Sequence, residues 1–151
     1  MDKVNLNLDL PRKIGLELKK VLERLGRESE SASVVLGATK LDSELEKLLK
    51  TALHNNPNGE DSLFDPDQPL SSFSAKINLA YRLNLIDRGF MNALHMIRKT
   101  RNDFAHSIDT ESLQEKIHKS RLTQATTELR KTFLWKVFEA LFSNTESIEL
   151  R

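Results

Sequence analysis

The sequence predicts an all-α fold, a single-domain bundle of five or six helices. Apolar residues recur every three or four positions through most of the chain after residue 10, which is the spacing of one buried helix face. The 151 residues are about the length of one ordinary domain and suffice to bury a core. No internal repeat or low-complexity segment interrupts the pattern. We therefore treat 1–151 as one helical domain with its helical core over 29–143.

The chain is expected to begin with an extended arm and a first helix. Residues 1–10 alternate polar and apolar side chains in "VNLNLDL", but no partner strand is visible, so we expect an extended N-terminal arm. Residues 10–26, "LPRKIGLELKKVLERLG", have the apolar spacing of a helix, with Pro11 in its first turn and Gly26 at its C-terminal end. The face predicted to be buried consists of Ile14, Leu18, Val21, Leu22 and Leu25.

A long second helix and an ordered loop are expected next. The helix is predicted over residues 29–55, with Leu41, Leu45, Leu48, Leu49, Ala52 and Leu53 on one side. Residues 56–72 are dense in Pro, Gly, Asn and Asp, which is typical of a loop. Phe64 and Leu70 give this loop its own apolar anchors, so we expect it to pack onto the bundle rather than link two domains.

Three or four further helical segments complete the predicted bundle. A short helix over 73–83 is expected to turn Phe73, Ile77, Ala80 and Tyr81 inward. The next helix should run over 87–107 with Asp87 as its N-cap. One or two more helices fill 110–143 and end in "FLWKVFEALF". The apolar residues there, Phe133, Leu134, Trp135, Val137, Phe138, Leu141 and Phe142, cover most of the helix circumference, which predicts a homodimer.

Composition excludes several classes of protein. Lys and Arg number 23 against 22 acidic residues, so any nucleic-acid contact would have to be a local basic patch. Cysteine is absent, and the four histidines lack metal-binding spacing, so we expect no metal site and no cofactor. No apolar run approaches the roughly 20 residues of a membrane span, and no signal peptide is visible. We expect a cytoplasmic protein without membrane contact.

The helix over 87–107 carries the candidate functional residues. Its predicted apolar stripe contains Phe90, Leu94, Ile97, Phe104 and Ala105. Arg101 falls inside this stripe and Arg98 falls at its edge, whereas Asn102 and His106 share the neighbouring face with His95 and Lys99. We take Arg101, Asn102 and His106 as candidate catalytic residues. His95, Arg98 and Lys99 are candidate binding residues.

Arg101 has a structural interpretation beside the functional one. A guanidinium keeps its charge, so inside an apolar stripe it needs a carboxylate, backbone carbonyls or a ligand. The structural interpretation pairs Arg101 with an acid of the second helix, most readily Glu44 or Glu46, and leaves His106 accessible to solvent. His54, His95 and His118 have the spacing of ordinary surface or helix-end histidines.

Two resemblances bear on this helix. "RNDFAH" is similar to the Arg-x4-His signature of HEPN domains, which are all-α bundles, many of them metal-independent endoribonucleases. The wider run "LFDPDQPLSSFSAKINLAYRLNLIDRGFMNALHMIRKTRNDFAHS" resembles the core of the mannitol operon repressor family. This second resemblance extends over about residues 44–107, somewhat under half of the chain. Together the two resemblances imply a HEPN-like helical bundle.

The resemblances imply two functions. The repressor family implies transcription regulation. The sequence contains no recognisable DNA-binding motif, so we expect it to act through a protein or RNA partner. The HEPN motif implies RNA cleavage without metal. His106 would then be the acid or base, Arg101 would stabilise the phosphoryl charge, and Asn102 would orient the imidazole or the phosphate. A non-catalytic dimerisation scaffold is the third interpretation.

Overall fold

The computed structural model describes residues 9–59, 61–106, 112–136 and 139. Within these residues it contains five α-helices, one short 3-10 helix and no strand, which confirms the predicted all-α bundle. The elements are α1 (Asp9–Leu25), α2 (Glu30–Ala52), η1 (Ser62–Phe64), α3 (Phe73–Arg82), α4 (Arg88–His106) and α5 (Lys116–Arg130).

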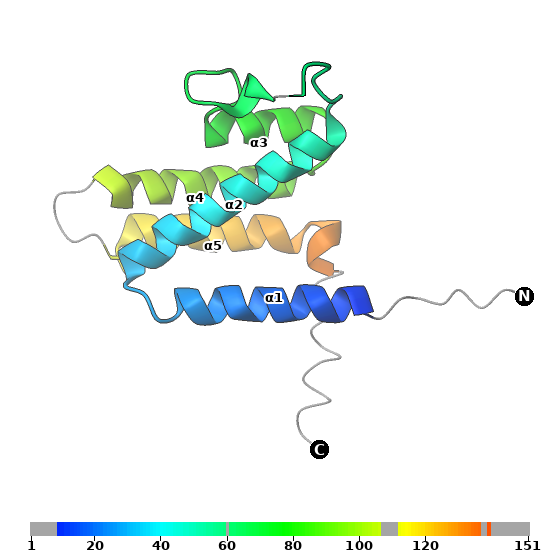
Figure 1. The fold of residues 1–151 in the computed structure, drawn as a ribbon. Coiled ribbons are helices and arrows are strands. Elements are labelled where there is room, and N and C mark those ends of the chain that lie inside the picture. The colour runs from blue at the N-terminus through cyan, green and yellow to red at the C-terminus, as the bar shows by residue number, and fades with distance from the viewer. Residues whose placement is uncertain (1–8, 60, 107–111, 137–138, 140–151) are drawn as a thin grey trace, which may run out of the picture.

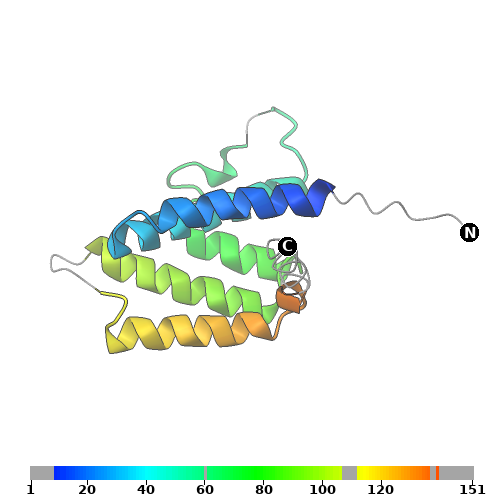
Figure 2. The same cartoon turned by 90° about the horizontal axis from the view of Figure 1, so that it is seen from below.

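The helices form two layers. α3, α4 and α5 lie side by side on one side of the molecule, and α1 and α2 lie on the other, with α2 crossing the first layer obliquely (Figures 1 and 2). α4 is central, because α2, α3 and α5 all pack against it. This arrangement leaves one side of α4 facing outward, away from α2.

α1 is less well covered than its periodicity predicts. It begins at Asp9, so the predicted arm over 1–10 is too long by two residues, and residues 1–8 lie outside the described chain. α1 packs mainly against α2. Leu18, Val21 and Leu25 are half-buried, but Ile14 and Leu22 are more than half exposed (56% and 57%). The prediction that these two residues are buried is therefore wrong.

α2 supplies one wall of the core. Ser29 caps its first turn by accepting a hydrogen bond from the backbone N–H of Ala32. Leu45 and Leu49 are buried, whereas Leu48 and Ala52 are exposed, so the face predicted to be buried is too wide. The main core cluster joins α2, the loop, α3, α4 and the turn between α3 and α4: Leu45, Leu49, Phe64, Ile77, Ala80, Ile86 and Leu94.

The loop between α2 and α3 packs onto the bundle, as predicted. Phe64 is buried in the core cluster, and Leu70 packs against that cluster. The backbone N–H of Leu70 donates to the carbonyl of Leu63 at 3.0 Å, which closes the loop on itself. The ammonium group of Lys50 lies 4.9 Å from the centre of the Phe64 ring, a cation–π contact that ties the loop to α2.

A tight turn sets α3 against α4. Asn84 has a left-handed backbone (φ 57°), and the N–H groups of Asn84 and Leu85 donate to the carbonyls of Tyr81 and Ala80, which is a Schellman motif. Asp87 then caps α4 by accepting from the N–H of Phe90 at 2.8 Å, which confirms the predicted N-cap. Tyr81 is exposed, so its predicted inward position is wrong.

α5 packs antiparallel to α4 through close contacts. At the start of α4, a Cβ atom on Gly89 would lie 2.8 Å from the carbonyl oxygen of Glu128. Near the other end, the rings of Phe104 and His118 lie 5.0 Å apart. His118 lies in the first turn of α5, as a helix-end histidine would, but it is only 1% exposed, so the surface position that the sequence also allowed is wrong. Its burial depends on how α5 is rotated against α4, which helical periodicity alone does not reveal.

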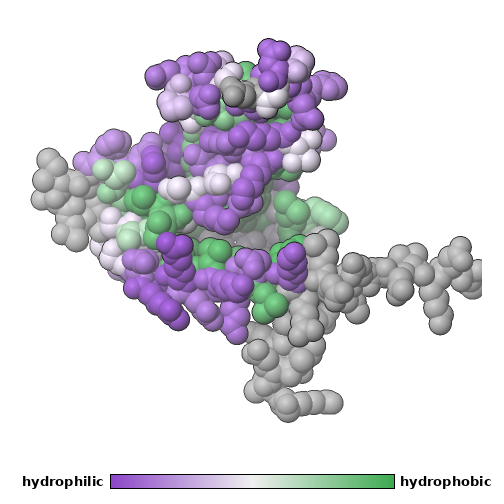
Figure 3. All heavy atoms as spheres, viewed as in Figure 1, coloured by the Kyte–Doolittle hydropathy of each residue, from purple (hydrophilic) through white to green (hydrophobic). Residues whose placement is uncertain are grey.

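Part of the apolar surface stays uncovered. Phe133 and Leu134 are exposed, while Val137, Phe138, Leu141 and Phe142, which belong to the same predicted stretch, lie outside the described residues. Figure 3 shows apolar surface along the boundary between α1 and the rest of the bundle. Across the described chain, no helix has both the length and the apolar character needed to cross a membrane.

Candidate anion-binding site on α4

Four candidate residues share the outward side of α4. An α-helix turns about 100° per residue, which places His95, Lys99, Asn102 and His106 within about 60° of one another. We call these four residues the α4 polar face. The buried residues of the helix, Ala93, Leu94, Thr100 and Phe104, lie on the opposite side.

The buried side of α4 differs in three positions from the predicted stripe, because Ala93 and Thr100 are buried and Ala105 is not. Thr100 is 2% exposed, and its hydroxyl donates to the carbonyl of Met96 at 3.1 Å, so it is buried without an unsatisfied donor. Ala105, predicted inside the stripe, is exposed. The stripe is therefore rotated toward α5, because α5 contributes the closest packing against α4.

Arg101 is half-buried and does not bind the predicted acids. Its Nη1 donates to Oδ1 of Asn102 at 3.1 Å, which joins two of the three candidate catalytic residues directly. Glu44 instead pairs with Lys40 and Lys47, and Glu46 pairs with Lys50 and Lys76. The predicted pairing of Arg101 with Glu44 or Glu46 is therefore wrong.

Lys76 of α3 forms ion pairs with two acidic residues of α2. It is 4% exposed, and its Nζ lies 2.7 Å from Oδ1 of Asp42 and 3.1 Å from Oε2 of Glu46. Burial disfavours the charge of Lys76, but its interactions with the carboxylates of Asp42 and Glu46, which accept from the ammonium group, outweigh burial and raise its pKa above the ordinary value. Sequence reasoning missed this cluster. The one available signal was the four-residue spacing of Asp42 and Glu46, which places both acids on one face of α2.

The cations of α4 have no carboxylate partner within the described part of the chain. Arg98 is half-buried and its Nε is buried without a hydrogen-bond partner, while Lys99 is exposed. The nearest acid along α4, Asp103, is held by Arg121 of α5. Arg98, Lys99 and Arg101 therefore present positive charge that no described side chain neutralises.

His95 senses these charges. Its Nε2 lies 3.0 Å from Oδ1 of Asn78 on α3, and because that oxygen only accepts, Nε2 is the donor. Burial lowers the pKa of His95, and the positive charges of Arg98 and Lys99 lower it further. Both effects favour the neutral imidazole, whereas an anion bound beside it would favour the charged form.

His106 is the accessible histidine of the site. It ends α4 and is exposed, which confirms the expectation from the sequence. It lies eleven positions after His95, about 16 Å along the axis at about 1.5 Å per residue. The two imidazoles therefore cannot act on the same phosphate within one chain.

Neither a metal site among the described residues nor a known related protein assigns a function to these side chains. Among the described residues, no three His, Asp or Glu side chains are grouped so that they could hold a metal ion. Comparisons with family models, curated proteins and solved structures find no match. The resemblance to the mannitol operon repressor family and to HEPN domains therefore stays a prediction.

Proposed function

We propose that this protein is a regulator that acts through an RNA partner, and that α4 binds the RNA by its phosphates. The α4 polar face would supply the contact surface, with Arg98 and Arg101 adding charge at its edge. The regulatory role follows the resemblance to the mannitol operon repressor family. The choice of RNA as partner follows the resemblance to HEPN domains, and the contact through phosphates follows the chemistry of α4.

The unpaired cations of α4 support this proposal most directly. On α2, Lys40, Lys47 and Lys50 each pair with a glutamate, whereas Arg98, Lys99 and Arg101 have no such partner among the described residues. Cations left without protein partners are available to replace the counterions of a nucleic-acid backbone, and the release of those counterions drives binding. Arg98 and Lys99 lie within about one helical turn of Asn102, whose side-chain amide can also donate a hydrogen bond to phosphate.

The packing of α4 favours a single-stranded nucleic acid over duplex DNA. A helix that reads DNA enters the major groove, which is about 12 Å wide and admits little more than the helix itself. α4 is flanked by α3 and α5 and offers only one side, so it cannot enter the groove alone. The phosphates of a single strand can instead lie across an exposed face.

RNA binding by Lys99 tests the proposal. We expect Lys99→Gln to weaken the binding of a fluorescent single-stranded RNA by up to about fivefold, the effect of losing one exposed ion pair. The slope of log affinity against log salt should also fall in magnitude by about 0.7. Lys47→Gln is the matched control, because it removes the same charge from an exposed lysine that already pairs with Glu44. Equal binding by all three proteins would contradict the proposal.

Metal-independent RNA cleavage is a second candidate function. It is favoured by an exposed His106 one helical turn from Asn102, which itself holds the guanidinium of Arg101. His106 would move a proton to or from the reacting oxygens, Arg101 would stabilise the charge that develops on the phosphoryl oxygens, and Asn102 would orient one of the two. A second acid or base would have to come from another copy of the chain, because His95 is too distant.

Cleavage in the presence of a chelator tests this second function. Wild-type protein should cut single-stranded RNA with EDTA present, and folded His106→Ala protein should not. His54→Ala is the control, since His54 is an exposed histidine that follows the end of α2 and does not belong to α4. A wild type that binds RNA without cutting it would leave the binding role alone.

A further inference from the structure

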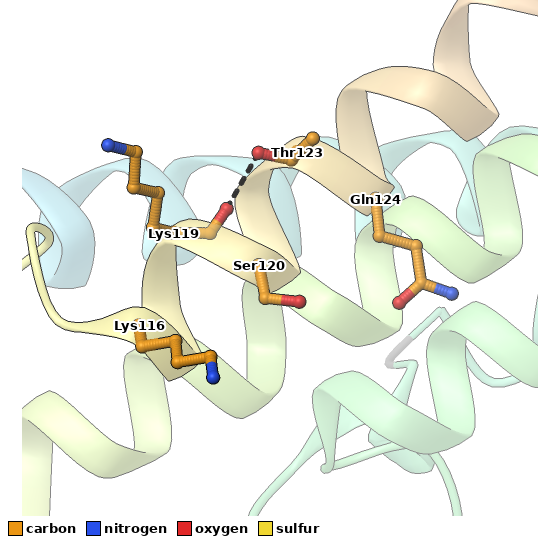
Figure 4. Close-up of a pocket in the computed structure, with 5 residues that line it drawn as sticks. All are labelled: Lys116, Lys119, Ser120, Thr123 and Gln124. Carbon is orange, nitrogen blue, oxygen red and sulfur yellow. Dashed lines mark hydrogen bonds between the residues drawn. The ribbon is translucent and has the colours of Figure 1, made fainter.

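We propose that the outer face of α5 is a second contact for the same RNA, one that holds the backbone without reading sequence. This inference rests on the proposed function. A hollow of about 480 Å³ lies on this face and is lined by Lys116, Lys119, Ser120, Thr123 and Gln124 (Figure 4). We call it the α5 hollow.

The charge of the α5 hollow is uniformly positive. The sequence from Lys116 to Thr127 contains no acidic residue, and the carboxylate of Glu115, which directly precedes it, accepts from the backbone N–H of Ser112. Within the described chain, neither Lys116 nor Lys119 has a carboxylate within ion-pair distance. A second hollow, at the end of α1, is different, because Glu23 and Glu28 line it together with its cations. An anion is therefore favoured at α5 and has no comparable site at α1.

The neutral side chains of the α5 hollow are hydrogen-bonding groups. Ser120 and Gln124 present a hydroxyl and an amide, both of which can donate to phosphate oxygens. Their side chains and that of Lys116 point to the same side of α5, while Lys119 and Thr123 point to the other (Figure 4). The Thr123 hydroxyl already donates to the carbonyl of Lys119 at 2.8 Å, so it shapes the hollow rather than supplying a donor.

The lining also indicates which part of a nucleic acid would bind. No aromatic side chain lines the hollow, so bases have no surface to stack on. No large apolar side chain lines it either, although the centre of a protein–protein interface is usually apolar. Phosphates are the anions that lysine, hydroxyl and amide groups recognise without either feature. The contact should therefore be independent of base sequence.

The α5 hollow continues the α4 polar face across one seam. Two contacts join α4 to α5 along the outer boundary between these helices, and we call this boundary the seam. Asn92 donates a hydrogen bond to Glu128, and Arg121 forms an ion pair with Asp103. On α4, Lys99 is the next residue outward from this seam, and on α5 the exposed Ile117 lies between the seam and Gln124. A strand that crosses the α4 polar face can therefore continue over the seam onto α5.

The salt dependence of RNA binding tests this inference. We would titrate wild type, Lys116→Gln/Lys119→Gln and Lys13→Gln/Lys19→Gln with two unrelated single-stranded RNAs of about 20 nucleotides, longer than one binding fold usually covers. Lys13 and Lys19 are the matched control, because they are exposed lysines of α1 and have no ion pair among the described residues. Losing two phosphate contacts should reduce the salt slope by about 1.4 in magnitude in the α5 double variant alone, equally for both RNAs.

The outcomes separate the two proposals. If wild type binds neither RNA, the proposed function and this inference both fail. If wild type binds and Lys99→Gln weakens binding, but the α5 double variant keeps the wild-type slope, this inference alone is overturned. A slope that falls for one RNA only would contradict a contact that ignores sequence. If an acidic peptide, added at the same concentration of charge, displaces RNA from α5, this face binds a protein and the inference that it binds RNA is contradicted.

Discussion

Lys76 shows how a single buried charge sets the position of α3. Its ammonium group is almost fully buried between Asp42 and Glu46, whereas the glutamate at position 44 lies on the exposed side of α2. We expect Asp42→Asn to lower the free energy of unfolding by about 1–3 kcal/mol, because Lys76 keeps its charge with one carboxylate fewer. Glu44→Gln should cost less than about 1 kcal/mol. Urea denaturation of both variants measures the difference, and equal costs would contradict this account of Lys76.

His95 reports the electrostatics of the α4 polar face. Burial and the charges of Arg98 and Lys99 lower its pKa below the ordinary value near 6.5. The folded protein thus holds the proton less tightly than the unfolded chain does, so this group makes the protein less stable as pH falls through 6.5 toward the lowered pKa. We expect Lys99→Gln to raise the pKa of His95 measured by NMR. An unchanged or lower pKa would show that Lys99 is too distant to act on the imidazole.

The structural role of a single residue could be predicted where it depends on neighbouring residues in the sequence. The Asp87 cap follows from the residues beside it in the chain, and the burial of Phe64 follows from an aromatic ring in a polar loop. The accessible His106 follows from its place at a helix end. The partners of Arg101 and Lys76 depend on how α2, α3 and α4 are rotated about their axes. Periodicity gives the face of each helix but not its register against a neighbour, so this information is absent from a single sequence.

The contact between α4 and α5 depends on the small size of Gly89. An added methyl group would lie 2.8 Å from the Glu128 carbonyl oxygen and 3.0 Å from Cγ2 of Thr132. We expect Gly89→Ala to destabilise the protein by about 1–3 kcal/mol, because the crowding outweighs the better helix propensity of alanine. Gly15→Ala is the control. Nothing lies within 4 Å of that position in α1, so alanine should stabilise the helix by up to about 1 kcal/mol. Thermal denaturation that ranks the two variants in the opposite order would contradict this packing.

The bounds of the helices were predicted closely, but the burial of their apolar faces was predicted less well. α3 and α4 begin and end within about one residue of the predicted bounds, because strong caps and a left-handed Asn84 define them. α2 ends three residues earlier than predicted, since Leu53 already has an extended backbone. α1 is amphipathic, but periodicity could not show that, among the described helices, mainly α2 would cover its apolar side.

The exposed apolar residues of the whole protein predict self-association. Ile14, Leu16 and Leu22 on α1 are each more than half exposed, and so are Phe133 and Leu134 after α5. Exposing such residues to water is unfavourable, and burying them against a second copy of the chain lowers the free energy. We expect light scattering at micromolar concentration to give a mass near twice 17.3 kDa. A single species of 17.3 kDa would contradict the homodimer and would remove the second copy that RNA cleavage requires.

RNA bound across the outward side of α4 is the central claim, and an NMR titration tests it most directly. Single-stranded RNA would be added to the wild-type protein while the imidazole signals of His95, His106 and His54 are followed. We predict that the signals of His95 and His106 shift and that the pKa of His95 rises, because phosphate brings negative charge beside it. The signal of His54, which lies after α2 and away from this face, should stay in place. RNA that binds without moving either α4 histidine would contradict the claim.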